Sequence, residues 1–492
     1  MISFFGLGRL GRLGNQLFQI ASIKGIATKL DTTCHFPQWH YSKYFKNKLP
    51  RIGRRFQTHY EPQFHHSEHW LIDNKDYHGW LQSEKYFDSS VKETFEFDTT
   101  FKDLVTAKYA KFFNKETIAI SVRRGDFVGN PNYELIPATY YIGALLKFDY
   151  KKYNIIFFSD DISYCKTHFE CLPNAYFCDG SDIEQLCCMT MCENHIISSS
   201  TFSWWGAYLS QSKRIIRPAY NFSAEYLLRF DDKDYYPERW EVFDHKGYKI
   251  PLDCTFIIPV TYDHIDRLEN LTLNIDFLKD FDTKIIIGEN KTRKMNADIH
   301  FDFEYFHRTK MLNELAKKGT EIIVNWDADV ICPPMQLIAA VDAIKSGYDM
   351  IYPYDGRLAR VGRKWYSELL RFLDVGILSK YEFAGTRDHD ERSVGGAVLF
   401  NKESFFKGGG ENENMISYAP EDRERFYRFD KLGFKIARIK GMIYHVDHYI
   451  GGDSSDENSF FDKNKEHFEI IKSLTTEQLK EYVSNNNTLS KS

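Results

Sequence analysis

The strongest constraint on the fold is an alternation of short apolar runs with helix-like segments, which stops near the middle of the chain and then starts again. In the first half, five such runs have the composition of buried strands. They are TIAISV (117–122), NIIFFS (154–159), AYFCD (175–179), HIISS (195–199) and RIIRPA (214–219). Helical patterns such as ATYYIGALLKF (138–148) and DIEQLCCMTMCE (182–193) lie between them. The alternation predicts a doubly wound α/β layer.

A polar joint, FDHKGYKIPLD (243–253), interrupts the pattern before a fresh strand-like run, CTFIIPV (254–260), begins. With 492 residues the chain is long enough for two or three domains. We therefore expect one domain over residues 1–247 and a second over residues 252–474. The remaining residues, 475–492, read as a polar tail with a disordered tip.

Composition excludes several classes of protein. The aromatic content of 16% excludes a disordered chain, and the net charge of −5 gives no basic signature for nucleic acid. No apolar stretch approaches the length of a membrane span, and the N-terminus lacks the features of a signal peptide. The nine cysteines form no C-x-x-C pair, so they indicate buried reduced thiols rather than a zinc site. Together these features predict a cytoplasmic protein.

The stretch SSSTFSWWGAYLS (198–210) follows one of the predicted strands directly. Ser200 or Thr201 can cap a helix there, and Phe202 lies in its first turn. Hydroxyls and free N–H groups at a helix start offer a binding place to an anion such as phosphate. The adjacent tryptophans either pack that helix against the sheet or form a platform for a sugar ring.

Arg123 and Arg124 follow the predicted strand 117–122, where open α/β sheets bind their ligands. Their guanidinium groups suit phosphate oxygens, and the alternative is a surface ion pair with Asp126. Near the N-terminus, GLGRLG (6–11) fits the weak G-x-G-x-x-G pattern of a dinucleotide site. The amide of Asn15 in the same loop favours hydrogen bonds to sugar hydroxyls instead.

Six segments of the first half resemble glycosyltransferase family 11, the α-1,2-fucosyltransferases. They are GRLGNQLFQIA (11–21), HGWLQSEKYF (78–87), SVRRGDF (121–127), FFSDD (157–161), MCENHIISSSTFSWWGAYL (191–209) and YYPERWEVF (235–243). The resemblance covers residues 1 to about 245. It implies a GT-B-like, inverting enzyme that needs no metal and takes fucose from GDP-fucose.

The resemblance also implies roles for individual residues. Arg123 and Arg124 would hold the β-phosphate, with Arg124 counted among the catalytic residues. The turn of Ser200, Thr201 and Phe202 would also bind the nucleotide sugar. Asn15 would lie near the reacting sugar. Asp182 would pair with guanine, although a carboxylate that merely stabilises a helix start is an equal alternative.

Two features of the first half remain open. Ser121 stands where the family pattern has histidine, so this contact to the nucleotide would be weaker or remade by the hydroxyl group. The catalytic base has three candidates, Asp126, Glu61 and Glu84, and their spacing does not decide between them.

In the second half, the segment EIIVNWDADVICPP (321–334) reads as an apolar strand that ends in Asp327 and Asp329, with two prolines after it. Alternate residues at a strand end can direct two carboxylates toward one ion, and oxygen ligands suit Mn²⁺ or Mg²⁺. The alternative is a solvated loop.

This half resembles the GT-A glycosyltransferases of the galactosyltransferase kind, through residues 393–429 and MIYHVDH (442–448). The resemblance implies a metal held by Asp327, Asp329 and His445, although a core histidine is an equal interpretation of His445. Asp422 would be the general base. The nucleotide would be contacted by Asp266 and Arg308, and also by Arg267 and Asn313.

The sequence thus predicts a bifunctional glycosyltransferase. The C-terminal half would use a UDP-hexose, galactose above all, and the N-terminal half would add α-1,2-linked fucose from GDP-fucose to a galactosyl glycan or glycoconjugate. Alternatively, only the fucosyltransferase half is active, and the C-terminal half binds glycan or transfers another sugar.

Overall fold

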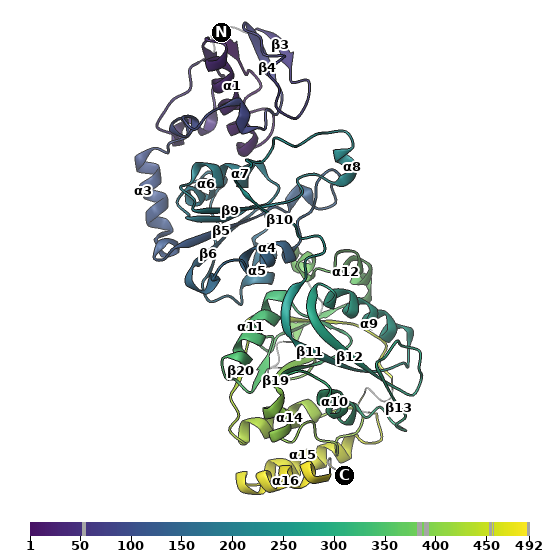
Figure 1. Ribbon diagram of the computed structural model, residues 1–492. Coiled ribbons are helices and arrows are strands. Elements are labelled where there is room, and N and C mark those ends of the chain that lie inside the picture. Colours follow the sequence, from purple (N-terminus) through teal and green to yellow (C-terminus); the bar gives the residue numbers. More distant parts are fainter. Residues whose placement is uncertain (52–55, 381–385, 388–392, 452–454, 456, 490–492) are drawn as a thin grey trace. The chain divides into compact units, whose positions relative to one another are not determined.

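The computed structural model describes residues 1–51, 56–380, 386–387, 393–451, 455 and 457–489. Within this part of the chain, two compact units are distinct (Figure 1). Unit 1 consists of residues 1–165 and 174–248, and unit 2 of residues 166–173 and 249–492. The change of unit after Tyr248 falls inside the polar joint.

Unit 1 begins with a small parallel sheet in the order β2-β1-β4-β3. Its strands are β1 (Ile2–Ser3), β2 (Cys34–His35), β3 (Gln57–Tyr60) and β4 (Lys75–His78). The long helix α1 (Leu13–Lys29) follows β1, and it is buried on all sides over residues 16–23. The GLGRLG loop therefore leads from a strand into a helix.

The second sheet of unit 1 has six parallel strands in the order β10-β9-β8-β5-β6-β7. They are β5 (Thr117–Val122), β6 (Asn154–Ser159), β7 (Ala175–Phe177), β8 (Asn194–Ile196), β9 (Arg214–Pro218) and β10 (Glu241–Phe243). The predicted strands and the parallel α/β layer are thereby confirmed. Successive strands run outward from β5 in one direction and from β8 in the other. Ligands bind at such a reversal point, beyond the carboxyl ends of the strands.

Helices cover both faces of this sheet, which explains why β5 and β6 are mostly apolar and are buried along their whole length. Figure 1 shows α6 and α7 on one face and α4 and α5 on the other. The helices of this region are α2 (Val91–Thr94), α3 (Thr99–Lys108), α4 (Ala138–Leu145), α5 (Ile162–Phe169), α6 (Asp182–Thr190), α7 (Thr201–Leu209) and α8 (Ala224–Leu227).

Unit 2 is built on a mixed sheet of seven strands in the order β13-β12-β11-β14-β19-β16-β20. They are β11 (Ile250–Thr261), β12 (Phe281–Asn290), β13 (Ile299–Phe301), β14 (Ile322–Trp326), β16 (Met350–Tyr352), β19 (Ala397–Asn401) and β20 (Ile436–Arg438). Strand β19 runs antiparallel to both of its neighbours. A smaller sheet contains β15 (Val330–Ile331), β21 (Ile443–Val446), β17 (Leu358–Val361) and β18 (Thr386–Arg387).

Most helices of unit 2 connect these strands, and the last two, α15 and α16, follow the final strand. They are α9 (Ile265–Leu278), α10 (Arg308–Lys317), α11 (Pro334–Lys345), α12 (Tyr366–Phe372), α13 (Lys402–Lys407), α14 (Glu421–Lys431), α15 (Phe461–Ser473) and α16 (Thr476–Leu489). Helix α16 occupies most of the predicted polar tail, a difference explained by its buried Leu479 and Val483, which are one helical turn apart. The predicted disordered tip, residues 490–492, lies outside the described residues.

Two predictions from composition can be compared with the structure. All nine cysteines are free thiols, and all of them except Cys34 and Cys171 are buried. Among the described residues, no helix combines the length and the apolar character needed to cross a membrane.

Candidate active site

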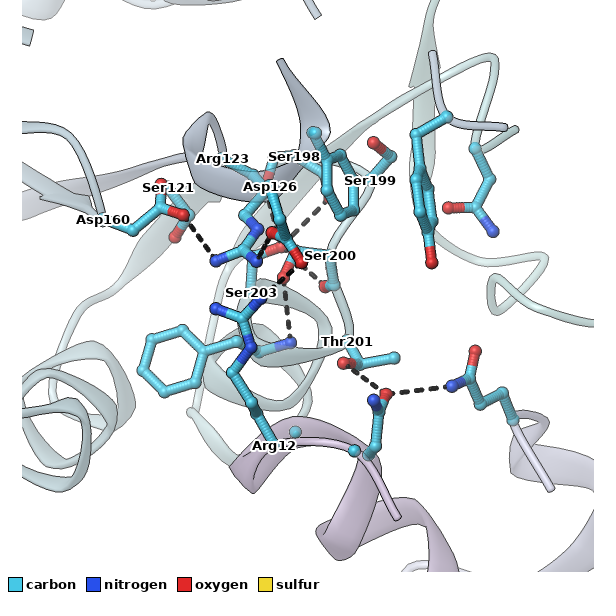
Figure 2. A pocket seen from close by; sticks show the side chains of 18 of the residues that line it. Arg12, Ser121, Arg123, Asp126, Asp160, Ser198, Ser199, Ser200, Thr201 and Ser203 are labelled. Carbon is cyan, nitrogen blue, oxygen red and sulfur yellow. Dashed lines mark hydrogen bonds and ion pairs between the residues drawn. The ribbon is translucent and has the colours of Figure 1, made fainter. Parts of the chain in front are cut away.

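A cavity of about 550 Å³ lies in unit 1, where the loops after β5 and β8 meet the start of α1 (Figure 2). Its lining includes residues 11–15, residues 121–123 and residues 198–203. The glycine loop, the arginine turn and the hydroxyl-rich turn are therefore neighbours in space. They come together at the point where the strand order reverses.

The starts of α1 and α7 touch each other beside the cavity. A Cβ on Gly14 would lie 2.5 Å from the backbone nitrogen of Phe202, so only glycine permits this approach. Asn15 joins the two segments, because its Oδ1 accepts hydrogen bonds from Thr201 Oγ1 at 2.9 Å and from Gln82 Nε2 at 3.0 Å. Two helix N-termini, whose first N–H groups have no partner within the helix, thus flank one cavity.

Hydroxyl groups fix the turn between β8 and α7. The Ser200 side chain accepts a hydrogen bond from the N–H of Phe202 at 3.3 Å and caps the helix, as predicted. Ser203 Oγ donates to the carbonyl oxygens of Ser198 and Ser200, at 3.0 and 2.8 Å. The turn is therefore held rigidly by its own side chains.

The adjacent tryptophans belong to the core. Trp204 and Trp205 have no exposed surface. Their ring centres lie 4.5 and 5.1 Å, respectively, from the ring centre of Phe18 on α1. They pack α7 against α1, which is the first of the two predicted alternatives.

Arg123 extends into the cavity and is paired with two carboxylates, as Figure 2 shows. Its Nη1 lies 2.6 Å from Asp160 Oδ2, and its Nη2 pairs with Asp126. Asp126 also pairs with Arg12. Partial burial alone would raise the pKa of Asp126, but the two guanidinium groups lower it. The ion pair with Asp126, predicted as the alternative to phosphate binding, is thus present in the wall of the cavity.

Arg124, predicted to bind phosphate beside Arg123, is not among the residues that line the cavity. Its side chain is buried with the guanidinium carbon 4.1 Å from the ring centre of Tyr164. Successive side chains at a strand end point in opposite directions, which separates the two arginines. The Arg124 backbone still contributes, because its N–H donates to Asp160 Oδ1 at 2.9 Å.

Asp182 and Ser121 both line the cavity. Asp182 begins α6 and accepts a hydrogen bond from the hydroxyl of Tyr41. Glu184 performs the capping function, since it accepts from the backbone N–H of Ser181 at 2.8 Å. Asp182 Oδ1 also accepts from the N–H of Ile183 at 2.7 Å, so the predicted alternative, a carboxylate at a helix start, is present as well.

Of the three candidate bases, Asp126 alone lines the cavity. Glu84 pairs with Arg239 at 2.7 Å. Glu61 accepts backbone hydrogen bonds from Trp80 at 2.7 Å and Leu81 at 3.1 Å, and burial raises its pKa to about 7. A carboxylate whose pKa is lowered, as that of Asp126 is, makes a weak base, so the base remains unassigned.

In unit 2, a second group of polar residues lies where β14 and β21 end. Ligand atoms of Asp329, His445 and His448 all lie within 4.8 Å of one another. His448 Nε2 is 2.9 Å from Asp329 Oδ2, and His445 Nε2 is 3.6 Å from Oδ1. Burial alone would raise the pKa of Asp329, but the two histidines and Arg267 hold it below its usual range.

His448 was not predicted from the sequence. The signal was present, because His445 and His448 form an H-x-x-H pattern at a strand end. Asp327 was predicted as a ligand, but it stands outside this group. Its Oδ1 accepts from Arg308 Nη2 at 2.7 Å, so this carboxylate is paired with a guanidinium group.

Arg308 links Asp327 to Asp422, the predicted general base. Its Nη2 bonds to Asp327, and its Nη1 lies 3.4 Å from Asp422 Oδ1. Arg425 is 2.9 Å from the same oxygen. Burial would raise the pKa of Asp422, but these two arginines lower it. Burial and the charge of Asp422 raise the pKa of neighbouring Glu421 to about 7. The pair thus contains one carboxylate that stays ionised and one that titrates near neutral pH.

Asp266, predicted to contact a nucleotide, lies in the first turn of α9 and accepts from the N–H of Tyr449 at 2.9 Å. Arg267, beside it, reaches Asp329 Oδ2 at 3.3 Å. Asn313 does not face this group: its amide donates to the Glu411 carbonyl at 2.9 Å, within the core. The starts of α9, α10 and α14 therefore contribute side chains around Asp327 and Asp329.

Comparison with known proteins assigns the first of these two sites to a class. The sequence model of glycosyl transferase family 11 matches residues 35–243. An alpha-1,2-colitosyltransferase of Escherichia coli is 30% identical over 213 residues, which is 39% of this chain and 71% of that protein. The chain belongs to glycosyl transferase family 11, and its N-terminal unit is a glycosyltransferase related to fucosyltransferases.

Two further relatives support the same class. The O-antigen biosynthesis glycosyltransferase WbnK of Escherichia coli is 33% identical over 21% of this chain, and the aligned part spans only 39% of that protein. A putative galactoside 2-alpha-L-fucosyltransferase of Caenorhabditis elegans, svh-11, is 25% identical over 48% of this chain and 77% of that protein. The family match ends at residue 243 and leaves unit 2 unassigned.

Solved structures show weaker similarity. The Bradyrhizobium fucosyltransferase NodZ, co-crystallized with GDP, is 13% identical with a TM-score of 0.33, over 44% of this chain and 93% of that chain. Drosophila beta1,4-galactosyltransferase 7 is 16% identical with a TM-score of 0.27, over 39% of this chain and 65% of that chain. These values are too low to assign a fold or an activity.

Proposed function

We propose that unit 1 transfers fucose from GDP-fucose, in α-1,2 linkage, to a galactosyl residue of a glycan or glycoconjugate. The observation that carries this proposal is the cavity at the reversal point of the sheet, where Arg123 meets the starts of α1 and α7. The relatives support the type of sugar and linkage, since one is named for α-1,2 transfer of colitose and another for 2-α-L-fucosyl transfer.

The chemistry follows from charge. When fucose leaves, negative charge develops on the β-phosphate of GDP, and fixed positive charge lowers the energy of that transition state. Arg123 would exchange part of its pairing with Asp126 and Asp160 for phosphate oxygens. The helix N-termini would add N–H donors and partial positive charge. The base that accepts the proton of the acceptor hydroxyl stays unassigned.

A screen of nucleotide release by the full chain tests this proposal. GDP-fucose, GDP-mannose, UDP-galactose and UDP-glucose are offered with a galactoside acceptor, and product linkage is determined by NMR. We expect GDP release from GDP-fucose and a 1→2 linkage. An Arg123→Ala variant should lose this reaction. A wild-type protein that releases no GDP, or that forms another linkage, would overturn the proposal.

We propose in addition that unit 2 transfers a hexose, galactose above all, from a UDP-sugar with the help of a divalent cation. Asp329, His445 and His448 fit a metal, because donor atoms of all three side chains already converge. Two imidazoles favour Mn²⁺ over Mg²⁺. A bound cation would supply positive charge for the departing diphosphate. At the start of α14, Glu421 would act as general base, because its pKa is raised to about 7, whereas the lowered pKa of Asp422 makes the predicted base the weaker one of the pair.

The alternative for unit 2 is a module that only binds glycan. UDP-sugar turnover, measured with and without Mn²⁺ in the wild type and in Asp329→Ala, separates the two. A hexosyltransferase requires turnover that depends on Mn²⁺ and that is lost in the variant. A glycan-binding module would show neither.

The two activities would serve one product, with the hexose added first and then capped by fucose. Joining successive transferases in one chain raises the local concentration of the shared acceptor. This order would be wrong if the product of unit 2 were not an acceptor for unit 1.

A further inference from the structure

One wall of the unit 1 cavity is aromatic, and neither the donor contacts nor the proposed chemistry uses it. Its six lining side chains are Phe64, Trp80, Tyr133, Phe222, Tyr226 and Phe230, here called the aromatic wall. Trp80 and Phe64 come from the N-terminal part of unit 1. The others come from the loop after β5 and from the segment after β9.

Five rings of the aromatic wall, all except that of Trp80, form a connected series. Phe222 lies 5.6 Å from Tyr133, 5.4 Å from Phe64 and 5.1 Å from Tyr226, measured between ring centres. Tyr226 stacks on Phe230 at 4.5 Å with an angle of 15° between the rings. Contacts of this kind fix the rings as one surface before any ligand arrives.

This surface is left partly open to water. Trp80 is 39% exposed and Phe230 is 37% exposed, although both are large apolar side chains that line a cavity. Uncovered aromatic surface inside a cavity indicates a ligand that covers it.

The strand order indicates which of the two substrates, donor or acceptor, covers the aromatic wall. Along the carboxyl edge of the sheet, the loops follow one another in the order β7, β6, β5, β8, β9. Asp182 and Gln185 follow β7, Arg123 follows β5, Ser200 follows β8, and the segment with Tyr226 follows β9. A donor with its base beside Asp182 and its diphosphate at Arg123 and Ser200 therefore leaves the β9 end of the cavity to the other substrate.

We propose that the aromatic wall is the acceptor subsite, where Tyr226, Phe230 and Trp80 stack against the apolar C–H face of an acceptor pyranose. This inference rests on the proposed function of unit 1 for the direction in which the donor lies. Stacking suits a sugar ring, because the ring presents C–H groups on its face and keeps its hydroxyls at the rim. Such a wall would hold the acceptor ring so that its attacking hydroxyl is correctly placed, without forming hydrogen bonds to it.

Two variants of the full-length protein test this proposal, Tyr226→Ala and Phe230→Ala. The control is Leu228→Ala, which removes a side chain that is 86% exposed in the same segment and does not line the cavity. Calorimetry gives the Kd of GDP for each protein. Saturation-transfer NMR with methyl β-galactoside, in the presence of GDP, reports which sugar protons lie close to the protein. Transfer kinetics give the KM of the same acceptor.

We expect transfer of saturation to the C–H protons of one face of the sugar in the wild type and in Leu228→Ala, and its loss in Phe230→Ala. The acceptor KM should rise about tenfold in each aromatic variant, while the Kd of GDP changes less than twofold. Phe230→Tyr should restore both the signal and the KM. An unchanged acceptor KM and signal would overturn the inference. A tenfold weaker GDP affinity would overturn it as well, because the wall would then hold the base.

The proposed function and this inference can fail separately. If the wild type releases no GDP from GDP-fucose but the sugar contact is present and depends on Phe230, the donor assignment is wrong and the subsite stands. If fucose is transferred but the sugar contact is absent, the subsite is wrong and the proposed function stands.

Discussion

At the scale of single residues, Arg123 and Arg124 show how neighbours in sequence acquire different surroundings. Arg123 reaches the cavity and pairs there with Asp160 and Asp126. Arg124 is buried over Tyr164, and its Nε has no hydrogen-bond partner among the described residues. The two guanidinium groups should therefore affect different properties of the protein.

Arg123→Ala should lower kcat/KM for GDP-fucose by about 10²- to 10³-fold, because it removes a charge-assisted contact to the leaving group. The melting temperature of unit 1 should change little. Arg124→Ala should instead destabilise unit 1 by about 1–3 kcal/mol, through lost packing in a buried position. Steady-state kinetics and calorimetry of both variants measure these effects. The prediction is wrong if Arg123→Ala mainly lowers stability and Arg124→Ala mainly lowers kcat/KM.

Glu61 makes stability depend on pH. Its pKa is raised to about 7 by burial, so the folded state favours the protonated carboxyl. The stability that this preference contributes is complete below the unfolded pKa of about 4.3 and is lost as pH rises through about 7. Glu61→Gln should therefore gain stability relative to wild type between pH 5 and pH 8, by up to about 3 kcal/mol. Thermal denaturation at both pH values measures the difference, and a constant difference would contradict the pKa of Glu61.

At the scale of elements, the site depends on the contact between the starts of α1 and α7. Gly14 makes that contact possible, and Asn15 bonds to Thr201 across it. The buried tryptophans of α7 pack against Phe18 of α1 and hold the two helices together. The positions of the N–H groups around the cavity are thus set by packing rather than by the loops.

Gly14→Ala should separate the two helix starts, because the added Cβ would meet backbone atoms that cannot move independently. We expect a loss of about 1–3 kcal/mol in stability and a GDP affinity at least tenfold weaker. Thr28→Ala, an exposed position at the other end of α1, is the control for a change within the same helix. Full GDP affinity in Gly14→Ala would show that the contact does not shape the site.

The sequence predicted helices and strands better than it predicted which residues lie close together in space. The strands β5 and β6 were found at their full length, because a run with both faces buried has a distinctive composition. Helix α16 was missed, because only Leu479 and Val483 mark its apolar side within a polar stretch. His448 was missed although its H-x-x-H spacing from His445 was visible in the sequence. The aromatic wall was missed for another reason: its residues lie in distant segments, and only the folded chain brings them together.

At the scale of the whole molecule, the chain joins two units whose candidate sites differ in their use of positive charge. In unit 1 the charge is built in as Arg123 and helix N-termini. In unit 2 we propose that a cation held by Asp329, His445 and His448, whose ligand atoms lie within 4.8 Å of one another, supplies the charge. The two activities should therefore respond differently to a chelator.

In the full-length protein, EDTA should abolish hexose transfer from the UDP-sugar and leave fucose transfer within twofold of its original rate. His448→Ala should lower hexose transfer at least tenfold and raise the Mn²⁺ concentration needed for half-maximal rate. Fucose transfer in that variant serves as the internal control. Equal sensitivity of both reactions to EDTA would contradict the difference between the units.

The affinity of GDP for the protein in EDTA, measured by calorimetry on wild type and Arg123→Ala, tests the central claim most directly. We predict that EDTA leaves the wild-type Kd unchanged and that Arg123→Ala weakens it by about tenfold to a hundredfold. GDP binding that EDTA abolishes, or that Arg123→Ala leaves unchanged, would contradict a cavity that uses fixed side-chain and helix charge in place of a metal.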